Sequence, residues 1–408
     1  MVAVVRSFLI FIVIVAVIVG AAVVYLTVTT PHQSGGIRFP LTSEERELLA
    51  QVPASAQSFA LIPAAAALDA KLRANPITRD ALHSWPGRNS VPRPWMFGSA
   101  DLLAWKSGES VQYFLRLDPF RAFFVRVYSL AARGLGQSVR INVSSEQPLD
   151  SGELTRILDL AAKLPPGDAL VVQRESGRGS FPPIGRPTVT SVQVTATDVN
   201  LTSISAAGEA PAATLNARLP RSALLAIAFV SPPRMLNDLN RLFGAKISSV
   251  LSDGGAIALY DIDTGKLLPR PIGVIAVPAD AQRRANFDSL VKTLHGGESL
   301  GYRVRTAERG GELLLSFDES IDQYLKDQFD DARVPGGQWA VVIDPKRLLP
   351  ILGRLSDNIG LRVASPRLFR AARDLEGWIT PLQGAERIEA NDSTNSGLEQ
   401  LRVHLAAK

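Results

Sequence analysis

Two stretches decide how this chain folds: Ser58-Phe59-Ala60-Leu61-Ile62 and Ala226-Ile227-Ala228-Phe229-Val230. Each is a short apolar run that precedes proline, a pattern typical of a buried strand leading into a helix. The segments before them are alike as well, with Val52-Pro53-Ala54-Ser55 ahead of the first and Leu219-Pro220-Arg221-Ser222 ahead of the second. A pattern that returns at this separation predicts a repeated structural unit.

After each stretch the sequence predicts the same series of elements. The series is a helix, a hairpin, a helix that begins near proline, a strand, another helix and two further strands. From the hairpin onward, the predicted members in the first half are residues 100–105, 112–117, 120–133, 138–143, 151–163, 169–173 and 188–196. Their predicted counterparts are residues 256–262, 272–277, 279–294, 302–306, 320–329, 339–343 and 398–405, and the first helix of the second half is predicted over 233–243.

Short strands that arrive as hairpins between helices favour antiparallel or mixed sheets over a doubly wound parallel sheet. The predicted fold class is therefore α+β: an N-terminal transmembrane helix followed by two similar, duplicated α+β halves with antiparallel-rich sheets. One irregular α+β domain, in which hairpin and helix units look alike by chance, is the alternative.

The first thirty residues predict the transmembrane helix. Phe8 to Leu26 are nineteen consecutive uncharged residues, all apolar apart from Gly20 and Tyr25. At about 1.5 Å per residue, such a helix nearly covers a hydrocarbon core of about 30 Å. A cleaved signal peptide is the competing interpretation, but its apolar region is usually about 7–15 residues long and ends at a small-residue cleavage site. We expect an uncleaved anchor.

Charge around this segment predicts its orientation. Arg6 is the one charged residue ahead of it, and the first positive charge beyond it is Arg38. The positive-inside rule then puts the N-terminus in the cytoplasm. The predicted location is the bacterial inner (cytoplasmic) membrane, crossed once, with the body in the periplasm. The expected partners are the membrane and another envelope protein.

Composition shifts along the chain predict five segments. They are a cytoplasmic stub and anchor (1–28), a tether and short helix (29–51), the first half (52–205), a linker (206–218) and the second half (219–408). The tether is rich in proline and glycine, and Thr42 or Ser43 is expected to cap the short helix. The linker follows from the Ala-rich segment around Gly208 and Pro211.

The chain carries a net charge of +5 and no cysteine. The absence of cysteine excludes disulfides and thiolate-ligated metal sites. Arginines are interleaved with acidic residues and no run of four basic residues occurs, which is typical of a solvated surface. A nucleic-acid binder usually concentrates its basic residues on one face, so no nucleic-acid partner is predicted.

Gly297-Glu298-Ser299-Leu300-Gly301 matches the G-x-S-x-G nucleophile pattern. A nucleophile elbow needs a strand before the serine and a helix after it, whereas here a predicted helix precedes and a predicted strand follows. The glycines at 296 and 297 are better explained as a helix stop. No catalytic residue is predicted.

No metal or cofactor is predicted either. The four histidines, at positions 32, 83, 295 and 404, never form a close pair. The segment Asp261 to Gly265 resembles the start of a calcium loop but lacks the later ligands, so a hairpin turn is the expected structure. Asp327, Asp330 and Asp331 are expected to end the helix predicted over residues 320–329.

The leading hypothesis for function is a non-enzymatic binding or scaffold module held at the membrane. The first alternative is a carrier of an apolar ligand such as lipid, which needs a continuous apolar cavity. The second alternative is a hydrolase that uses Ser299, which needs a histidine within reach of that serine.

Overall fold

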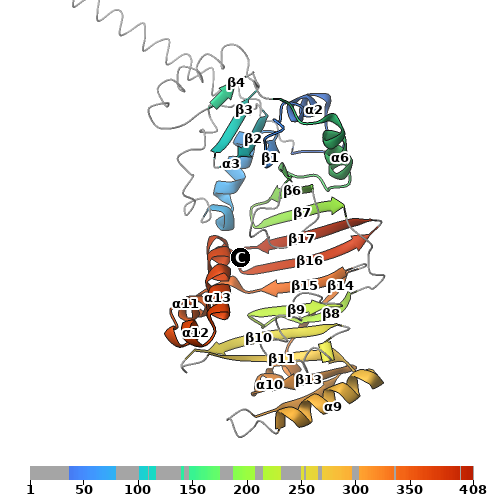
Figure 1. The fold of residues 1–408 in the computed structure, drawn as a ribbon, viewed down its shortest axis with the longest axis vertical. Coiled ribbons are helices and arrows are strands. Elements are labelled where there is room, and N and C mark those ends of the chain that lie inside the picture. Colours follow the sequence, from blue (N-terminus) through green and yellow to red (C-terminus); the bar gives the residue numbers. More distant parts are fainter. Residues whose placement is uncertain are drawn as a thin grey trace, which may run out of the picture. The chain divides into compact units, whose positions relative to one another are not determined.

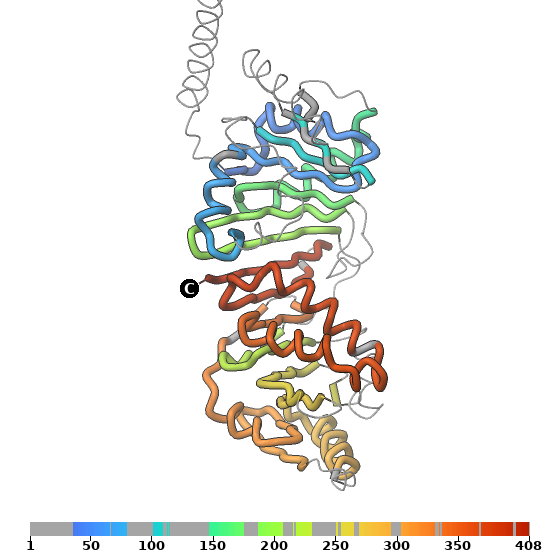
Figure 2. The backbone as a smooth tube through the Cα atoms, turned by 90° about the vertical axis from the view of Figure 1, so that its left-hand side faces the viewer, coloured from blue at the N-terminus to red at the C-terminus, as the bar shows by residue number. Residues whose placement is uncertain are grey.

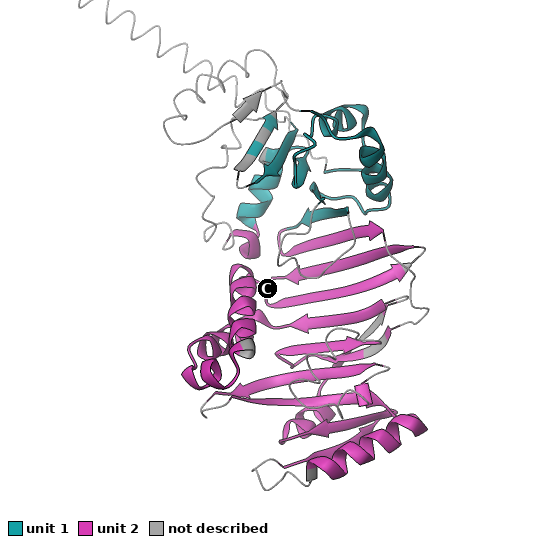
Figure 3. Ribbon diagram, viewed as in Figure 1, with its two compact units in different colours: residues 1–74, 85–195 teal, residues 75–84, 196–408 magenta. Residues whose placement is uncertain are grey.

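The computed structural model describes residues 36–79, 101–108, 110–115, 139–141, 147–174, 187–206, 215–230, 250–251, 254–264, 269–295, 303–334, 337–395 and 397–407. The chain divides into two compact units, residues 1–74 with 85–195 and residues 75–84 with 196–408 (Figure 3). The segment expected to span a membrane, residues 8–26, lies outside the described part. Within that part, none of the helices has the length and apolar character needed to span a bilayer.

Unit 1 is a sheet with helices beside it (Figure 1). Its elements are α2 (Ser43–Leu49), β1 (Ser58–Ile62), α3 (Ala65–Ala74), β2 (Leu102–Ser107), β3 (Ser110–Leu115), β4 (Val139–Ile141), α6 (Ser151–Ala161), β5 (Ala169–Gln173) and β6 (Thr188–Val194). The strand order is β6-β5-β1-β2-β3-β4. Every pairing is antiparallel except β3 with β4, which is parallel.

Local sequence explains the elements of unit 1. Thr42 caps α2 through a capping box: its Oγ1 accepts from the Glu45 amide at 3.2 Å, and Glu45 Oε2 accepts from the Thr42 amide at 2.7 Å. In β1, Phe59 and Leu61 are buried and their neighbours are half-buried, as the alternation of a strand requires. Phe59 pairs across the sheet with Trp105, a fully buried side chain.

Unit 2 contains a longer sheet. Its elements are β7 (Asp198–Ala206), β8 (Leu215–Pro220), β9 (Leu225–Phe229), β10 (Gly255–Asp263), β11 (Arg270–Pro278), α9 (Ala281–His295), β12 (Arg305–Arg309), β13 (Glu312–Ser316), α10 (Ser320–Lys326), β14 (Phe329–Val334), β15 (Gly337–Ile343), α11 (Pro345–Ser356), α12 (Ile359–Ala364), α13 (Pro366–Ile379), the 3-10 turn η5 (Thr380–Leu382), β16 (Arg387–Asn395) and β17 (Leu398–Ala406). The order is β12-β13-β11-β10-β9-β15-β16-β17-β7, and β14 and β8 form a separate ribbon.

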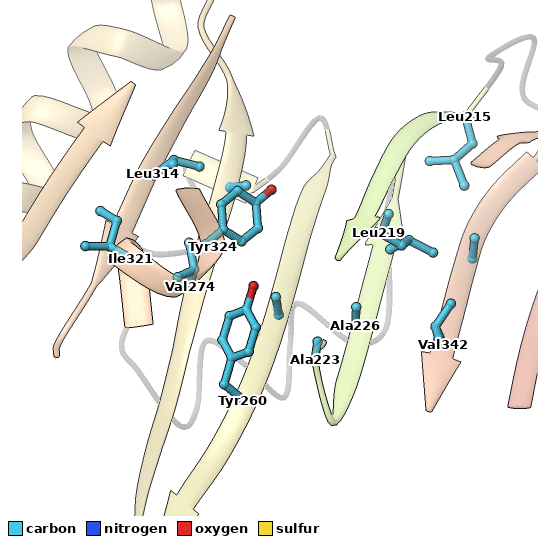
Figure 4. Packing of buried hydrophobic residues seen from close by; sticks show 14 residues of the cluster. Leu215, Leu219, Ala223, Ala226, Tyr260, Val274, Leu314, Ile321, Tyr324 and Val342 are labelled. Atoms are coloured by element: carbon cyan, nitrogen blue, oxygen red, sulfur yellow. The ribbon is translucent and has the colours of Figure 1, made fainter. Parts of the chain in front are cut away.

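One face of the unit 2 sheet is lined by small side chains. They belong to neighbouring strands and are Ala226, Ala228, Ala258, Ala276 and Ala340. Leu215 and Leu219 of β8 and Tyr324 of α10 pack against this face, as Figure 4 shows. Because alanine extends little from the sheet, the β8–β14 ribbon can lie close against the strands.

The opposite face carries larger side chains. Phe229, Val277 and Leu313 pack there against Phe287 and Leu290 of α9. Helices α11–α13 lie at one end of the strands, on the left in Figure 1 and facing the viewer in Figure 2. Side chains on both faces of the sheet therefore take part in packed cores.

The two units share an order of strands. The series β6-β5-β1-β2-β3 of unit 1 has the same connectivity as β16-β15-β9-β10-β11 of unit 2. In each unit the strand of this series that comes first in the chain, β1 or β9, is central and antiparallel to both neighbours: Phe59 pairs with Trp105 and Val172, and Ala226 pairs with Ala258 and Val342. The next strand differs, because β4 runs parallel to β3 whereas β13 runs antiparallel to β11.

The predicted α+β class and the antiparallel character of the sheets are confirmed. The helix predicted over residues 320–329 is wrong at its end, since it stops at Lys326 and Asp330 lies in β14. Pairing with β8 gives that segment backbone partners that a longer helix would forgo. By its neighbours, β6 corresponds to β16 rather than to the predicted residues 398–405. The helices predicted over residues 120–133 and 233–243 lie outside the described residues.

The sequence did not predict β7, β8, β13, β14, β16 or helices α11–α13. The predicted linker, residues 206–218, overlaps two strands, because β7 ends at Ala206 and β8 begins at Leu215.

Candidate functional site

The clearest difference between corresponding parts of the two units is a helical insertion. In unit 1, β5 and β6 are joined by residues 174–187. In unit 2, the corresponding β15 and β16 are joined by residues 344–386, which fold into α11, α12, α13 and η5. We call residues 345–382 the helical insertion.

Each helix of the insertion has a clear start signal. Asp344 caps α11, its Oδ1 accepting from the Arg347 amide at 3.0 Å, and Pro345 occupies the first turn. Asn358 caps α12 by accepting from the Leu361 amide at 2.7 Å. Pro366 opens α13. Three capped or proline-led starts in close succession keep the segment in short, sharply turned helices.

The inner side of the insertion is apolar. Leu348, Ile351, Leu352 and Leu355 of α11 pack with Leu361 of α12 and with Ala372 and Ile379 of α13. Leu224, just before β9, belongs to the same cluster. Arg347 adds a polar tie, donating from Nη1 to the Ser222 carbonyl oxygen at 2.8 Å. The insertion is thus fixed to the sheet of unit 2 rather than hanging free.

The insertion is basic. From Pro345 to Ile379 it holds seven Lys or Arg residues and three Asp or Glu residues, a net +4 in a chain whose total is +5. Arg354, Arg362, Arg370 and Arg373 are exposed, and in the described part of the chain none of them forms an ion pair with a carboxylate. The guanidiniums of Arg354 and Arg370 donate instead to backbone carbonyls of their own helices.

Apolar side chains are exposed on the same insertion. Ile359 and Val363 lie one turn apart on α12 with 78% and 77% of their surface exposed, and Arg362 stands between them in sequence. Trp378 of α13 is 57% exposed. Protein surfaces usually scatter such residues singly, so this adjacent pair, on the same insertion as exposed arginines without a described carboxylate partner, makes the region a candidate interaction surface. We call Ile359, Arg362 and Val363 the α12 tip.

A second polar cluster surrounds Asp327, at the end of α10. Asp327 Oδ2 accepts from Ser222 Oγ at 2.6 Å and from the Tyr260 hydroxyl at 3.2 Å. Burial, with Asp327 close by, raises the pKa of Tyr260 above its ordinary value. Gln323 Nε2 donates to Ser222 Oγ at 3.3 Å.

This cluster does not have the geometry of a nucleophile. The Ser222 hydroxyl donates its proton to a carboxylate, and in the described residues no histidine contacts it to act as a general base. The contacts instead join the C-terminal end of α10 to the turn after β8. We assign them a structural role.

His404 of β17 lies beside two polar residues of β7. Its Nδ1 is 2.7 Å from Asn200 Oδ1, and its Nε2 is 3.7 Å from Asp198 Oδ1. Thr197 Oγ1 donates to Asp198 Oδ2 at 2.7 Å. The one hydroxyl in this group therefore points its proton at the carboxylate rather than at the imidazole, and no nucleophile–base pair is formed.

The structure describes little of the rejected sequence motifs. Ser299 and its neighbouring glycines, and also His32 and His83, lie outside the described residues. Helix α9 ends at His295. Among the described residues, no group of three or more His, Cys, Asp or Glu side chains is placed to hold a metal ion.

Comparison of the chain with known protein families, curated proteins and solved structures gives no match.

The basic character of the helical insertion was not predicted from the sequence, because its arginines are separated by three to eight residues and never form a run. A local count of charge over residues 345–379 was the available signal. Helical periodicity then brings Arg370 and Arg373 together on α13, since residues three and four apart are neighbours on a helix.

Proposed function

We propose that this protein is a membrane-anchored protein of the cell envelope whose exported body acts as a non-enzymatic binding or scaffold module. The helical insertion is the binding surface in this proposal. The observation that carries it is that exposed arginines with no described carboxylate partner occur together with exposed Ile359 and Val363 on a segment that is packed firmly against the sheet.

The uncharged segment from Phe8 to Leu26 supports the anchor, and the asymmetry between Arg6 and Arg38 supports export of the body. The described chain begins at Gly36, and Ile37 is buried and bridges to Gly167. About nine residues then separate the span from folded structure, a reach of at most about 30 Å. The proposed tether therefore keeps unit 1 near the bilayer.

We further propose that the two halves arose by duplication. The shared order of five strands supports this, because chance similarity of hairpins does not predict the order in which the strands lie in a sheet. The insertion then stands out as an addition to the second copy. An added segment that is basic and exposes apolar residues suits binding better than folding, since its outer side chains contribute nothing to the core.

The absence of cysteine allows a direct test of topology. Ser289, exposed on α9, is replaced by Cys in the full-length chain, which is expressed in a bacterial host. A membrane-impermeant maleimide should label this cysteine in spheroplasts without lysis. Labelling that requires lysis of the spheroplasts contradicts export of the body.

A photo-crosslinking residue then tests the binding surface. Placed at Arg373 of the insertion, it should crosslink to a lipid or a protein in cells, whereas the same residue at Ser289 of α9 should crosslink to neither. The two competing functions have their own signatures. Co-purification of stoichiometric lipid after detergent exchange would favour a carrier, and an esterase activity abolished by Ser299→Ala would favour a hydrolase.

A further inference from the structure

We propose that the α12 tip docks on an anionic lipid surface, with Ile359 and Val363 entering the headgroup region and the surrounding arginines binding lipid phosphates. The inference rests on the proposed function and names the partner of the same surface. It commits to lipid rather than to protein or nucleic acid.

The shape of the tip fits an interface between water and lipid. Ile359 and Val363 lie on the same side of α12 because they are four residues apart, and both are more than three-quarters exposed. Leu361 of the same helix is buried in the insertion's core. Helix α12 therefore points Leu361 inward and Ile359 and Val363 outward, and the outward pair has no described partner.

Charge complements the apolar pair. Between Arg354 and Arg373 the sequence holds five arginines and a single acidic residue, Asp357. The guanidinium of Arg362 lies 6.0 Å from the centre of the Phe369 ring, an arrangement that leaves its donors open to a ligand. Basic residues near a membrane are attracted to its anionic lipids, so the four exposed arginines at 354, 362, 370 and 373 favour an anionic surface.

The aliphatic residues favour lipid over nucleic acid. Single-stranded nucleic acids are usually bound by aromatic stacking and duplexes by polar contacts to phosphates and base edges. Neither mode uses a pair of exposed, branched aliphatic side chains. Interfacial helices, by contrast, combine arginine or lysine with apolar side chains that reach the boundary of the acyl chains.

The experiment uses the full chain reconstituted in lipid nanodiscs. Val363→Cys carries an environment-sensitive fluorophore, and Ser289→Cys on α9 carries the same fluorophore as the matched control. One set of discs contains only phosphatidylcholine, and the other contains about one-third phosphatidylglycerol. In the anionic discs we expect a blue shift, about a two-fold rise in emission and quenching by nitroxide-labelled lipids at position 363. The control position should respond in neither set.

A charge variant tests the role of the arginines. Arg362→Gln combined with Arg370→Gln should reduce the response at position 363 several-fold without changing the thermal unfolding midpoint, because both side chains are exposed. If the double variant lost the fluorescence response and also had a lower unfolding midpoint, Arg362→Gln and Arg370→Gln would be measured singly. Each single variant would be compared with the wild type at a temperature that gives equal stability.

Three results overturn the proposal. Equal emission at position 363 in the two sets of discs excludes anionic lipid. A change in emission on addition of duplex DNA, without a change in anionic discs, assigns the surface to nucleic acid. A change in emission only when a crosslinked protein is present assigns the surface to a protein partner. These failures are distinct from failure of the proposed function, because maleimide labelling of Ser289→Cys in spheroplasts reports export of the body whatever the tip binds.

Discussion

Thr202 of β7 pairs with Arg402 of β17, and each is the fifth of nine residues in its strand. The pairing is symmetric about this point, with Asp198 opposite Ala406 and Ala206 opposite Leu398. The two nine-residue strands are therefore antiparallel and paired over their full length without a register shift.

The β7–β17 contact predicts one stability effect. Leu405 is buried and pairs with Val199, which is also buried. We expect Leu405→Ala to lower the free energy of unfolding by about 2–4 kcal/mol, through lost burial and a residual cavity. Urea unfolding of the full chain in detergent measures this. Arg402→Ala on the same strand is the control, since Arg402 is exposed and should change stability by less than about 0.5 kcal/mol.

Asp392 of β16 predicts a pH effect. Its carboxylate accepts from the backbone amides of Trp339 at 2.9 Å and Gln338 at 3.2 Å, where the register of β15 shifts. Burial, with Glu399 adding to it, raises the pKa of Asp392 to about 6. Between about pH 4 and 6 the folded state therefore keeps a proton on Asp392 that the unfolded chain, with a pKa of about 3.9, has released. Stability from this group is present below about pH 4 and falls as pH rises to about 6.

The matched variants separate the charge of Asp392 from its hydrogen bonds. Asp392→Asn keeps an oxygen that can accept from both amides and removes the buried charge, so its unfolding midpoint at pH 7.5 should equal or exceed that of the wild type. Asp392→Ala leaves the two amides unpaired and should cost about 1–3 kcal/mol. Thermal unfolding across pH 4–8 checks both. If the unfolding midpoint of Asp392→Asn changed with pH between about pH 4 and 6 as much as that of the wild type, Asp392 would not be the source of the pH dependence.

The half-buried ion pair of Arg174 with Glu153 in unit 1 predicts that lysine cannot replace Arg174 without loss of stability. Its Nε and Nη2 bind the two oxygens of Glu153 at 2.6 and 2.8 Å, while Nη1 donates to the Ala54 carbonyl at 2.7 Å. Arg174→Lys loses this bidentate geometry and should destabilise the chain by about 1–2 kcal/mol. The same change at Arg284, which forms a bidentate but fully exposed pair with Glu308, is the control. No change in the unfolding midpoint is expected there.

The alanine-lined face of unit 2 predicts intolerance to larger side chains. Ala258 is buried and faces the β8–β14 ribbon. Ala258→Leu should cost about 1–3 kcal/mol or more, because the ribbon has to move away from the sheet. Ile257→Leu, on the opposite face, conserves volume and should cost less than about 1.5 kcal/mol. Equal costs at both positions would contradict the close packing of the ribbon.

Much of unit 1 and part of unit 2 could be predicted from local patterns. Strand β5 has the predicted bounds, α2 begins at the predicted cap, and α6 and the hairpin of β10 and β11 differ from prediction by a few residues. Each of these elements has a signal within its own residues, such as the Thr42–Glu45 capping box or an apolar alternation. The candidate surface could not be predicted in this way, because its meaning depends on which side of each helix faces the core.

The sequence alone determined the α+β class and the positions of several hairpins and helices, since period and capping act over a few residues. The tertiary structure decided three things: the pairing of β7 with β17, the ribbon of β8 and β14, and the exposure of Ile359 and Val363 beside unpaired arginines. Each depends on contacts between residues far apart in the chain. Such contacts are chosen by competition among many similar strands and apolar faces, and no local pattern records the outcome.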